Sequence, residues 1–528
     1  MSKNILIGGA WPYANSDLHL GHIAGLISGD ILARYFRLQG DNVMYVSGTD
    51  CHGTPITERA KKEKKSPKEI AEYYHERDKE TLEKFDFSYD LYTKTETDFH
   101  KQEVMKMFKR MYDNGYIYEK IEPQAYCEHC QKFLSDRELE ITCPKCGQTT
   151  KAEQCDNCQY VPTIEDMKEG ICLECKEKIV LKDNKNLYLE LSKFQKDIEE
   201  YVENNNSLWR VNAKNETAKY LKQGLVDRAV TRDLDWGVDI PVPGYETKKM
   251  YVWIEAVLGY ITATMKKCEE LGKNWEEFWK EEYSPTIYMV HGKDNIVFHS
   301  IIFNALLMAM KDNYHLVNTV VSSEYLNIND EKISKSKGNG TPAIELVEKY
   351  GVDPLRFHLI NNGPEKKDSN FTIEALIATN NGELLNKFGN LVNRTLKFKE
   401  LEEVPQGKLD EEIKEKIEET YKLVGENIEK LEFKTASDIA MQLVETANKY
   451  YDEQKPWVQK KEDIEGFNNT IYTCSVIIAN LANIFEPFMP NACEKIRKYL
   501  GLQEKSWKLI EPKPGLKLEG IEPLFTRI

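Results

Sequence analysis

The stretch "NSDLHLGHIAGLISGDILARY", residues 15–35, decides how this chain folds. Its apolar residues recur at the spacing of a helix, at Ile23, Leu26, Ile27 and Ile31. The run "NILIGGA" at residues 4–10 precedes it and "NVMYVSGTD" at residues 42–50 follows it, and each has the apolar character of a buried strand. A strand, a helix and a second strand in this order predict a βαβ unit in a parallel sheet.

Two histidines flank a glycine where this helix is expected to begin. His19 and His22 stand beside a helix N-terminus, whose unpaired N–H groups and dipole attract phosphate oxygens. Gly21 would let a flat base approach the backbone. The alternative is an ordinary helix start with a core histidine, and this four-residue pattern alone does not decide between the two.

The α/β pattern resumes after a segment rich in cysteine. Residues 248–265 and 284–310 are each predicted to form a strand followed by a helix, and residues 316–340 a strand followed by a Lys/Ser/Gly loop. One α/β domain split by an insertion explains this pattern better than two separate domains. After about residue 371 the sequence is almost wholly helical, which predicts a C-terminal bundle.

The loop after the last predicted strand carries "KISKS" at residues 332–336. Lys332 and Lys335 on a Ser/Gly loop suit a mobile arm whose ammonium groups neutralise charge on a polyphosphate in the transition state. A lysine-rich loop by itself is usually only solvated. The order is informative, because the HLGH motif follows the first strand and the KISKS motif follows the last.

This ordered pair resembles the two signatures of class I aminoacyl-tRNA synthetases. Residues 19–22 match the HIGH signature and residues 332–336 match KMSKS, with Ile333 in place of the usual methionine. Four further motifs are similar to those of the methionyl-tRNA synthetases, over a resemblance that runs from about residue 4 to about residue 500. They are "AWPYAN" at 10–15, "GTDCHGTPI" at 48–56, "YVWIEAVLGY" at 251–260 and "HGKDNIVFH" at 291–299.

The resemblance implies an α/β fold: a Rossmann-type parallel-sheet catalytic core with a zinc-knuckle insertion and a C-terminal α-helical bundle. The expected boundaries are 1–115 and 226–325 for the two halves of the core, 116–225 for the insertion, 326–372 for the KISKS and stem-contact region, and 373–528 for the anticodon-binding domain and tail.

The resemblance also implies the reaction and its residues. ATP and Mg²⁺ activate L-methionine, which is then esterified to the 3′-terminal ribose of tRNA(Met), including the initiator. The residues implied for ATP and the transition state are His19, Gly21, His22, Arg232, Lys332, Ser334 and Lys335. Those implied for methionine are Trp11, Tyr13, Asp50, Trp253, Ala256, Tyr260, His299 and Phe303. Tyr260 and the Trp11 backbone N–H would face the sulfur, and Asp50 would hold the ammonium.

Eight of the twelve cysteines form four CxxC pairs, at residues 127/130, 143/146, 155/158 and 172/175. Thiolates at this spacing wrap one side of a tetrahedral zinc ion, so eight of them suit two structural ions. The spacing does not fix which pairs share an ion. The resemblance implies nesting, with Cys143, Cys146, Cys155 and Cys158 on one zinc and Cys127, Cys130, Cys172 and Cys175 on the other; a sequential pairing stays open.

The predicted bundle is expected to read the tRNA anticodon. Asn386, Asn390 and Arg394 recur every four residues and so share a helix face, and Trp457 after Pro456 offers a ring for stacking on an unpaired base. By resemblance, Asn390, Arg394 and Trp457 contact the CAU anticodon. A plain solvated face is the alternative.

The composition restricts the class of protein. The net charge of −15 argues against nucleic-acid binding through bulk charge, although a local basic surface is not excluded. We expect a cytoplasmic monomer without a signal peptide or a membrane span. Two rival hypotheses remain: a zinc-ribbon nucleic-acid-binding protein without catalysis, and a class I synthetase for another amino acid. Neither accounts for all the motifs together, because the first ignores the HLGH–KISKS order and the second ignores Tyr13, Asp50 and Trp253.

Overall fold

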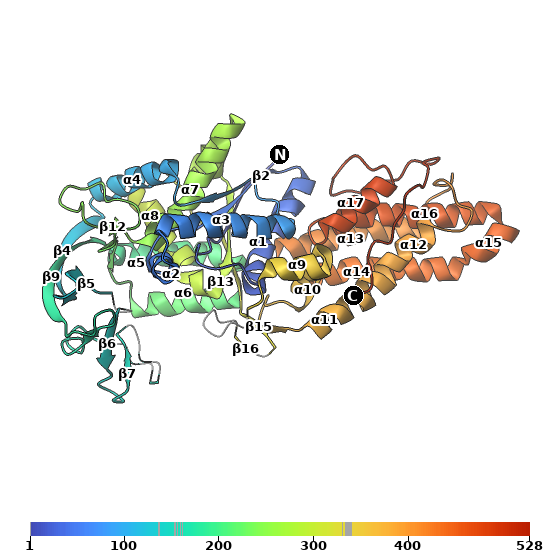
Figure 1. Ribbon diagram of the computed structural model, residues 1–528. Coiled ribbons are helices and arrows are strands. Elements are labelled where there is room, and N and C mark those ends of the chain that lie inside the picture. Colours follow the sequence, from blue (N-terminus) through green and yellow to red (C-terminus); the bar gives the residue numbers. More distant parts are fainter. Residues whose placement is uncertain are drawn as a thin grey trace.

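The fold is built on a five-stranded parallel sheet in a computed structural model of the chain (Figure 1). The structure describes residues 2–528 except 136–137, 153–154, 156, 159, 161, 330 and 333–339, and describes only the backbone of 331 and 332. The strand order is β14-β13-β1-β2-β3. Their bounds are Asn4–Gly9 (β1), Asn42–Thr49 (β2), Leu91–Lys94 (β3), Thr286–Gly292 (β13) and Thr319–Ser323 (β14).

The two faces of this sheet pack against different layers. Ile5 and Ile7 of β1 face a core shared with α1 (Leu20–Gln39) and the C-terminal helices. Leu6, between them, faces a second core with α4 (Asp98–Asp113), α7 (Val252–Leu271) and α8 (Phe303–Met310). Because successive side chains of a strand point to opposite faces of the sheet, each face packs against its own layer of helices. The helices α2 (Thr54–Glu63) and α3 (Pro67–Lys84) lie between β2 and β3.

The single split α/β domain is confirmed, because β1–β3 and β13–β14 belong to one sheet although the cysteine segment separates them in sequence. The charged residues 66–112 look helical in the sequence, but β3 interrupts the helices there and pairs in parallel with β2. Its four half-buried residues make a short edge strand, which carries too few residues for a clear periodic signal.

The insertion leaves the core along a long antiparallel ribbon. Its strands β4 (Ile117–Cys127) and β9 (Val180–Leu189) pair over ten residues and carry β5 (Lys132–Phe133) and β10 (Arg228–Ala229) at their edges. The cysteine knuckles form a separate small sheet of β6 (Leu139–Thr142), β7 (Thr149–Lys151) and β8 (Ile171–Cys172). The chain returns through α5 (Gln195–Asn205), α6 (Val211–Gln223), β11 (Thr231–Arg232) and β12 (Lys249–Met250).

A small sheet connects the core to the helical part. It contains β15 (Leu326–Ile328), β16 (Glu331–Lys332) and β17 (Ser369–Phe371), with α9 (Ala343–Tyr350) and α10 (Val352–Asn362) between β16 and β17. The predicted bundle follows and is confirmed. It comprises α11 (Ile373–Thr379), a π-helix (Asn380–Gly389), α12 (Asn390–Leu396), α13 (Glu411–Glu429), α14 (Phe433–Gln454), α15 (Pro456–Glu462), α16 (Ile464–Ile484) and α17 (Pro490–Tyr499).

The molecule is elongated, with the knuckle strands β6 and β7 at one end and α15 at the other (Figure 1). The C-terminal segment packs back onto both parts. Trp507 contacts Tyr35 of α1 at 4.9 Å between ring centroids, and Phe525 contacts Phe388 at 6.0 Å. In the part of the chain that the structure describes, no helix is long and apolar enough to cross a membrane.

Candidate active site

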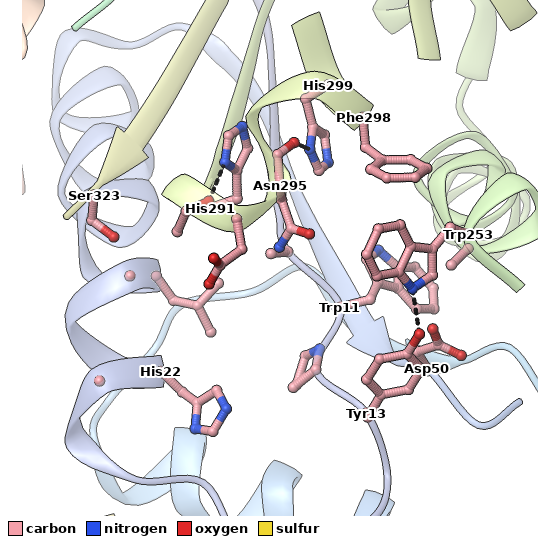
Figure 2. Close-up of a pocket in the computed structure, with 18 of the residues that line it drawn as sticks. Trp11, Tyr13, His22, Asp50, Trp253, His291, Asn295, Phe298, His299 and Ser323 are labelled. Atoms are coloured by element: carbon pink, nitrogen blue, oxygen red, sulfur yellow. Dashed lines mark hydrogen bonds between the residues drawn. The ribbon is translucent and has the colours of Figure 1, made fainter. Parts of the chain in front are cut away.

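A cavity of about 460 Å³ opens at the carboxyl ends of the central strands (Figure 2). The chain leaves β1 toward β2 on one side, while β13 and β14 lie on the other, so the connections diverge at this point. Ligands of open parallel sheets bind at such switch points. The cavity brings together most of the residues predicted for ATP and methionine: Trp11, Tyr13, His19, Gly21, His22, Asp50, Trp253, Ala256, Tyr260 and His299.

The first end of the cavity is the N-terminus of α1. His19 is the N-cap residue: its Nδ1 accepts the Gly21 N–H at 3.1 Å, and His22 Nδ1 accepts the His19 N–H at 3.1 Å. The two rings stack with centroids 3.8 Å apart. Since each Nδ1 is an acceptor, the neutral form of each ring carries its proton on Nε2. The motif therefore builds a helix start that presents two ring N–H donors at the cavity.

The other end is an apolar slot between β1, β2 and α7. Trp11 is wedged between two glycines: a Cβ on Gly48 would lie 2.4 Å from its Cζ3, and one on Gly259 would lie 2.8 Å from its Cζ2. Trp253 packs edge-on against Phe298 with centroids 4.2 Å apart. Trp253 also donates its indole N–H to the Tyr13 hydroxyl, as Figure 2 shows. The slot thus has rigid aromatic walls.

Two neutral histidines close the slot from β13 and the π-helix Phe298–Ile302. Burial lowers the pKa of His299 to about 4, and burial together with His299 holds the pKa of His291 well below its usual value. His299 Nδ1 donates to the Asn295 carbonyl at 2.9 Å, so its Nε2 accepts from the Tyr260 hydroxyl at 2.9 Å. The Tyr260 hydroxyl therefore donates its hydrogen bond to His299. This geometry does not favour the expected role of Tyr260 as a donor to a sulfur atom.

Asp50 lies on the floor of the cavity and is buried. Its backbone N–H donates to the Pro12 carbonyl at 2.8 Å and its carbonyl accepts from Ala14 at 2.8 Å, which joins the ends of β1 and β2. Burial and the nearby Glu255 carboxylate raise the pKa of Asp50 well above its usual value. A buried carboxylate of this kind is stabilised by an incoming cation.

Several predicted residues lie elsewhere. Phe303 is fully buried behind Tyr260, at 5.9 Å between centroids, and does not line the cavity; Phe298 takes that place. Phe303 begins α8 directly after the π-helix, and this π-helix carries both Phe298 and His299 of the cavity wall. Arg232 lies outside the cavity lining, on β11, where it stacks over Tyr251 at 4.2 Å and donates to the carbonyls of Ala229 and Thr231.

The predicted lysine loop falls mostly outside the described residues. Ser334 and Lys335 are not described, and Lys332 is described only by its backbone, which pairs with Asn327 in the β15–β16 hairpin. The flanks of the loop are described. Leu326 at the start of the hairpin lines the cavity, and beyond the loop Ala343 N–H donates to the Leu18 carbonyl at 2.8 Å. Both flanks therefore converge on the HLGH end of the site.

Sequence reasoning missed the residues on the β13 and β14 side of the cavity. They are His291, Gly292, Asp294, Asn295, Phe298, Ser323, Glu324 and Tyr325. The motif at residues 291–299 contains five of them, and the position directly after the last predicted strand would have indicated the other three. Tyr325 donates to Asp294, and Lys293 bridges Glu324 and Asp368 at 2.7 Å each, so this side is held together by charge.

The eight knuckle cysteines form two clusters, each with four sulfur atoms within 4.8 Å of one another. One contains Cys127, Cys130, Cys172 and Cys175, and the other Cys143, Cys146, Cys155 and Cys158. This is the nested arrangement, and the sequential pairing is wrong because the β4–β9 ribbon brings the outer pairs together. Four thiols at this spacing fit a tetrahedral zinc ion without an open position.

The residues predicted for the anticodon lie at the far end of the bundle. Asn386 and Asn390 are exposed, and Trp457 keeps 48% of its surface exposed. Arg394 is more restrained: it pairs with Asp452 at 2.8 Å and stacks over Tyr451 at 4.2 Å, and Tyr451 in turn contacts Trp457. Contacts with Tyr451 therefore link Arg394 and Trp457, and they hold Arg394 against α14.

Comparison with known proteins agrees with this arrangement. The family model described as "tRNA synthetases class I (M)" matches residues 5–396, which contain the split core and the cavity, so the chain is a class I tRNA synthetase. The model described as "Anticodon binding domain of methionyl tRNA ligase" matches residues 402–523. The chain belongs to the methionyl-tRNA synthetase family.

Individual relatives cover nearly the whole chain. It is 45% identical over 528 residues to "Methionine--tRNA ligase 1" of Alkaliphilus oremlandii and 46% identical over 530 residues to "Methionine--tRNA ligase" of Bacillus mycoides, in each case over 99% of this chain and 97% of the relative. A Mycobacterium tuberculosis methionyl-tRNA synthetase solved in complex with methionyl-adenylate has the same fold, with a TM-score of 0.81 at 24% identity over 99% of this chain and 100% of that one.

Proposed function

We propose that this cavity joins methionine to ATP, forming methionyl-adenylate and pyrophosphate, and that the methionyl group then passes to the 3′-terminal ribose of tRNA(Met), including the initiator. The observation that carries the proposal is the single cavity that links the α1 N-terminus to an aromatic slot with a buried carboxylate. The names of the relatives and the methionyl-adenylate bound to the Mycobacterium tuberculosis enzyme support the same reaction.

At the ATP end, the proposed roles follow from the helix start. The Nε2–H groups of His19 and His22 and the dipole of α1 attract phosphate oxygens. Gly21 leaves the backbone open to the adenine ring. Mg²⁺ would arrive with the ATP phosphates and neutralise part of their charge.

At the amino-acid end, Asp50 receives the substrate ammonium, and the slot lined by Tyr13, Trp253 and Ala256 receives the side chain. A thioether is polarisable and suits aromatic walls. Because Tyr260 donates to His299, the Trp11 backbone N–H, which the family resemblance implies, is the better donor for the sulfur. The indole Nε1 of Trp11 is buried and has no surface on the cavity.

The chemistry needs no side-chain nucleophile. A carboxylate oxygen of methionine attacks the α-phosphorus, the bond to the bridging oxygen breaks, and pyrophosphate leaves with that oxygen. The protein contributes alignment and charge stabilisation. We assign Lys335 to the α-phosphate in the transition state, with Lys332 assisting. Arg232 lies on β11 outside the cavity lining, so its assistance requires the side chain to leave Tyr251.

Two further parts of the proposal concern metal and tRNA. Each cysteine cluster holds one Zn²⁺ in a structural role, because four thiolates fill the coordination sphere. Cysteine thiolates that serve as zinc ligands suit a reducing compartment, so we propose a cytoplasmic location. Asn386, Asn390 and Trp457 are exposed for contact with the anticodon, and a monomer suffices for both functions.

Two substitutions test the separation of roles. Lys335→Ala should lower methionine-dependent ATP–pyrophosphate exchange by about 100-fold or more, because a transition-state charge is lost. Trp457→Ala should leave exchange unchanged and lower tRNA charging. Lys508→Ala, an exposed lysine on the C-terminal segment, is the matched control for the first. Equal loss of both activities in both variants would overturn the assignment.

A further inference from the structure

We propose that Glu255, which does not line the cavity, is a positioning residue that keeps the ammonium-binding Asp50 and the methionine slot aligned with each other. The inference rests on the proposed function of the cavity and deepens it. Buried histidines from α4 and from the segment after β2 hydrogen-bond to this one carboxylate on α7.

Glu255 is fully buried, and both of its oxygens are occupied by histidines from other elements. His52 Nδ1 lies 2.6 Å from Oε1, and His100 Nε2 lies 2.8 Å from Oε2. His52 follows β2, His100 lies on α4 and Glu255 lies on α7. One side chain therefore joins three elements whose sequence positions are far apart.

The arm through His52 leads to Asp50. The His52 backbone N–H donates to Asp50 Oδ1 at 3.1 Å, and the opposite side of its ring contacts Glu96 at 2.7 Å. Lys101 completes this arm with an ion pair to Glu96 at 2.6 Å. Two carboxylates flank one imidazole, and they raise the pKa of His52 to about 9 despite its burial. His52 is thus charged at neutral pH and donates from both ring nitrogens, which fixes the backbone that holds Asp50.

The arm through His100 leads to the slot. Its Nδ1 lies 2.9 Å from Thr262 Oγ1 on α7, and its ring packs against Trp11 with centroids 6.3 Å apart. Glu255 itself lies next to Ala256 and two residues from Trp253, both of which line the cavity. The helix that carries the slot and the loop that carries Asp50 are therefore anchored to the same carboxylate.

This anchoring has a specific consequence for the substrate. Methionine binding needs the ammonium and the side chain to be received at the same time, so the distance between Asp50 and the slot determines affinity. ATP binding depends on the α1 N-terminus, which is not part of this network. A shift of about 1 Å between reacting groups can cost about 100-fold in rate. Loss of Glu255 should thus affect methionine far more than ATP.

Glu255→Gln tests this at constant size. Its NH₂ group would face a histidine N–H, so at least one of the two hydrogen bonds is lost. Measured by ATP–pyrophosphate exchange on the full chain, the variant should raise KM for methionine by about 10- to 100-fold and change KM for ATP by less than about twofold. Glu269→Gln is the matched control, because Glu269 lies on the same helix but is exposed and pairs only with Lys266.

Thr262→Val is a milder second variant for the case that Glu255→Gln does not fold. It removes only the hydroxyl that supports His100, and it should raise KM for methionine about threefold with KM for ATP unchanged. A role confined to general stability would lower the melting temperature and change both KM values in the same ratio. That result, or an unchanged KM for methionine in a folded Glu255→Gln protein, would overturn the proposal while leaving the proposed function intact.

Failure of the proposed function looks different. If the unmodified protein, shown to be folded, exchanges no pyrophosphate with methionine, the function assigned to the cavity is wrong and the role of Glu255 falls with it. If the unmodified protein exchanges normally, only the ratio of the two KM values in the variants decides about Glu255.

Discussion

Hydrogen bonds to neighbouring groups determine which atoms of the histidine rings in this site are donors and which are acceptors. His19 and His22 accept backbone N–H groups at Nδ1, so the neutral form of each ring carries its proton on Nε2. His299 donates to a carbonyl from Nδ1 and therefore accepts the Tyr260 hydroxyl at Nε2. The sequence motifs predicted these residues, but they did not predict the tautomer of each ring.

The role of Tyr260 can be tested with norleucine, in which a methylene group replaces the sulfur. Tyr260→Phe should leave the ratio of kcat/KM for methionine over norleucine nearly unchanged, because its hydroxyl donates to His299. A fall in this ratio of about three- to tenfold would show instead that the hydroxyl donates to the sulfur. Pyrophosphate exchange measures both substrates.

Asp353 predicts a pH dependence of stability. Burial raises its folded-state pKa to about 6, although its Oδ2 accepts the Ala492 N–H at 2.6 Å. Between about pH 4 and pH 6 the folded chain holds a proton that the unfolded chain releases, so this group favours folding at low pH and the gain is lost as the pH rises through 6. Asp353→Asn should therefore become more stable relative to the unmodified protein between pH 4.5 and pH 7, by at most about 3 kcal/mol.

Thermal unfolding of both proteins across that pH range measures the difference. A difference in free energy of unfolding that stays constant with pH would show that Asp353 does not titrate there. An opposite trend would show that its pKa is lowered rather than raised.

Elements of the chain differ in how they gain stability. The main sheet and α1 pack into large hydrophobic cores, whereas the knuckles have a small separate core that includes Ala125, Leu139, Ile141 and Met167. A core of this size cannot offset the entropy of ordering such a segment, and the zinc ions that we propose for the two clusters would supply the rest.

Zinc removal should therefore act locally. Chelation should release two zinc ions per chain and abolish amide protection in residues 127–175, while β1, β2 and β13 keep theirs. Cys143→Ser should bind one ion and keep the other cluster, because the two sets share no ligand. Hydrogen exchange and metal analysis measure these outcomes. Loss of protection throughout the core would contradict the separate-core account.

The whole molecule is joined by buried charge between α1 and the bundle. Asp30 of α1 accepts from Arg356 of α10 at 2.6 Å and from Arg34 at 2.8 Å, and both side chains of the Asp30–Arg356 pair are fully buried. Arg34 also pairs with Glu486 at 3.2 Å, and Glu486 with Arg497 at 2.9 Å. Buried ion pairs therefore connect α1, whose N-terminus forms one end of the cavity, to the helical domain.

Breaking this connection should be costly. Arg356→Leu leaves Asp30 with one partner fewer in a buried site, and should lower the free energy of unfolding by about 3 kcal/mol. Arg110→Leu, which removes an exposed pair with Asp312, should cost less than about 1 kcal/mol. Denaturant unfolding compares the two. Equal effects would show that the buried network is not a major contributor.

The parts that the sequence predicted are those with strong periodicity or strict spacing. The βαβ unit at residues 4–50, the split domain and the helical bundle follow from apolar patterns. The nested pairing of the cysteines depends on the β4–β9 ribbon, which leaves no short-range signal in the sequence. Only the family resemblance predicted this pairing. The position of Phe303 behind Tyr260 and the ion pair that holds Arg394 against Asp452 depend on contacts between segments far apart in sequence, which only tertiary structure creates.

The most direct measurement for the central claim is ATP–pyrophosphate exchange by the zinc-loaded protein with each of the twenty amino acids in turn. We expect exchange that depends on the amino acid and is strongest with methionine, because one cavity joins the HLGH helix start to the aromatic slot and Asp50. Strongest exchange with another amino acid would contradict the slot assignment. No exchange with any of them would contradict the proposed reaction itself.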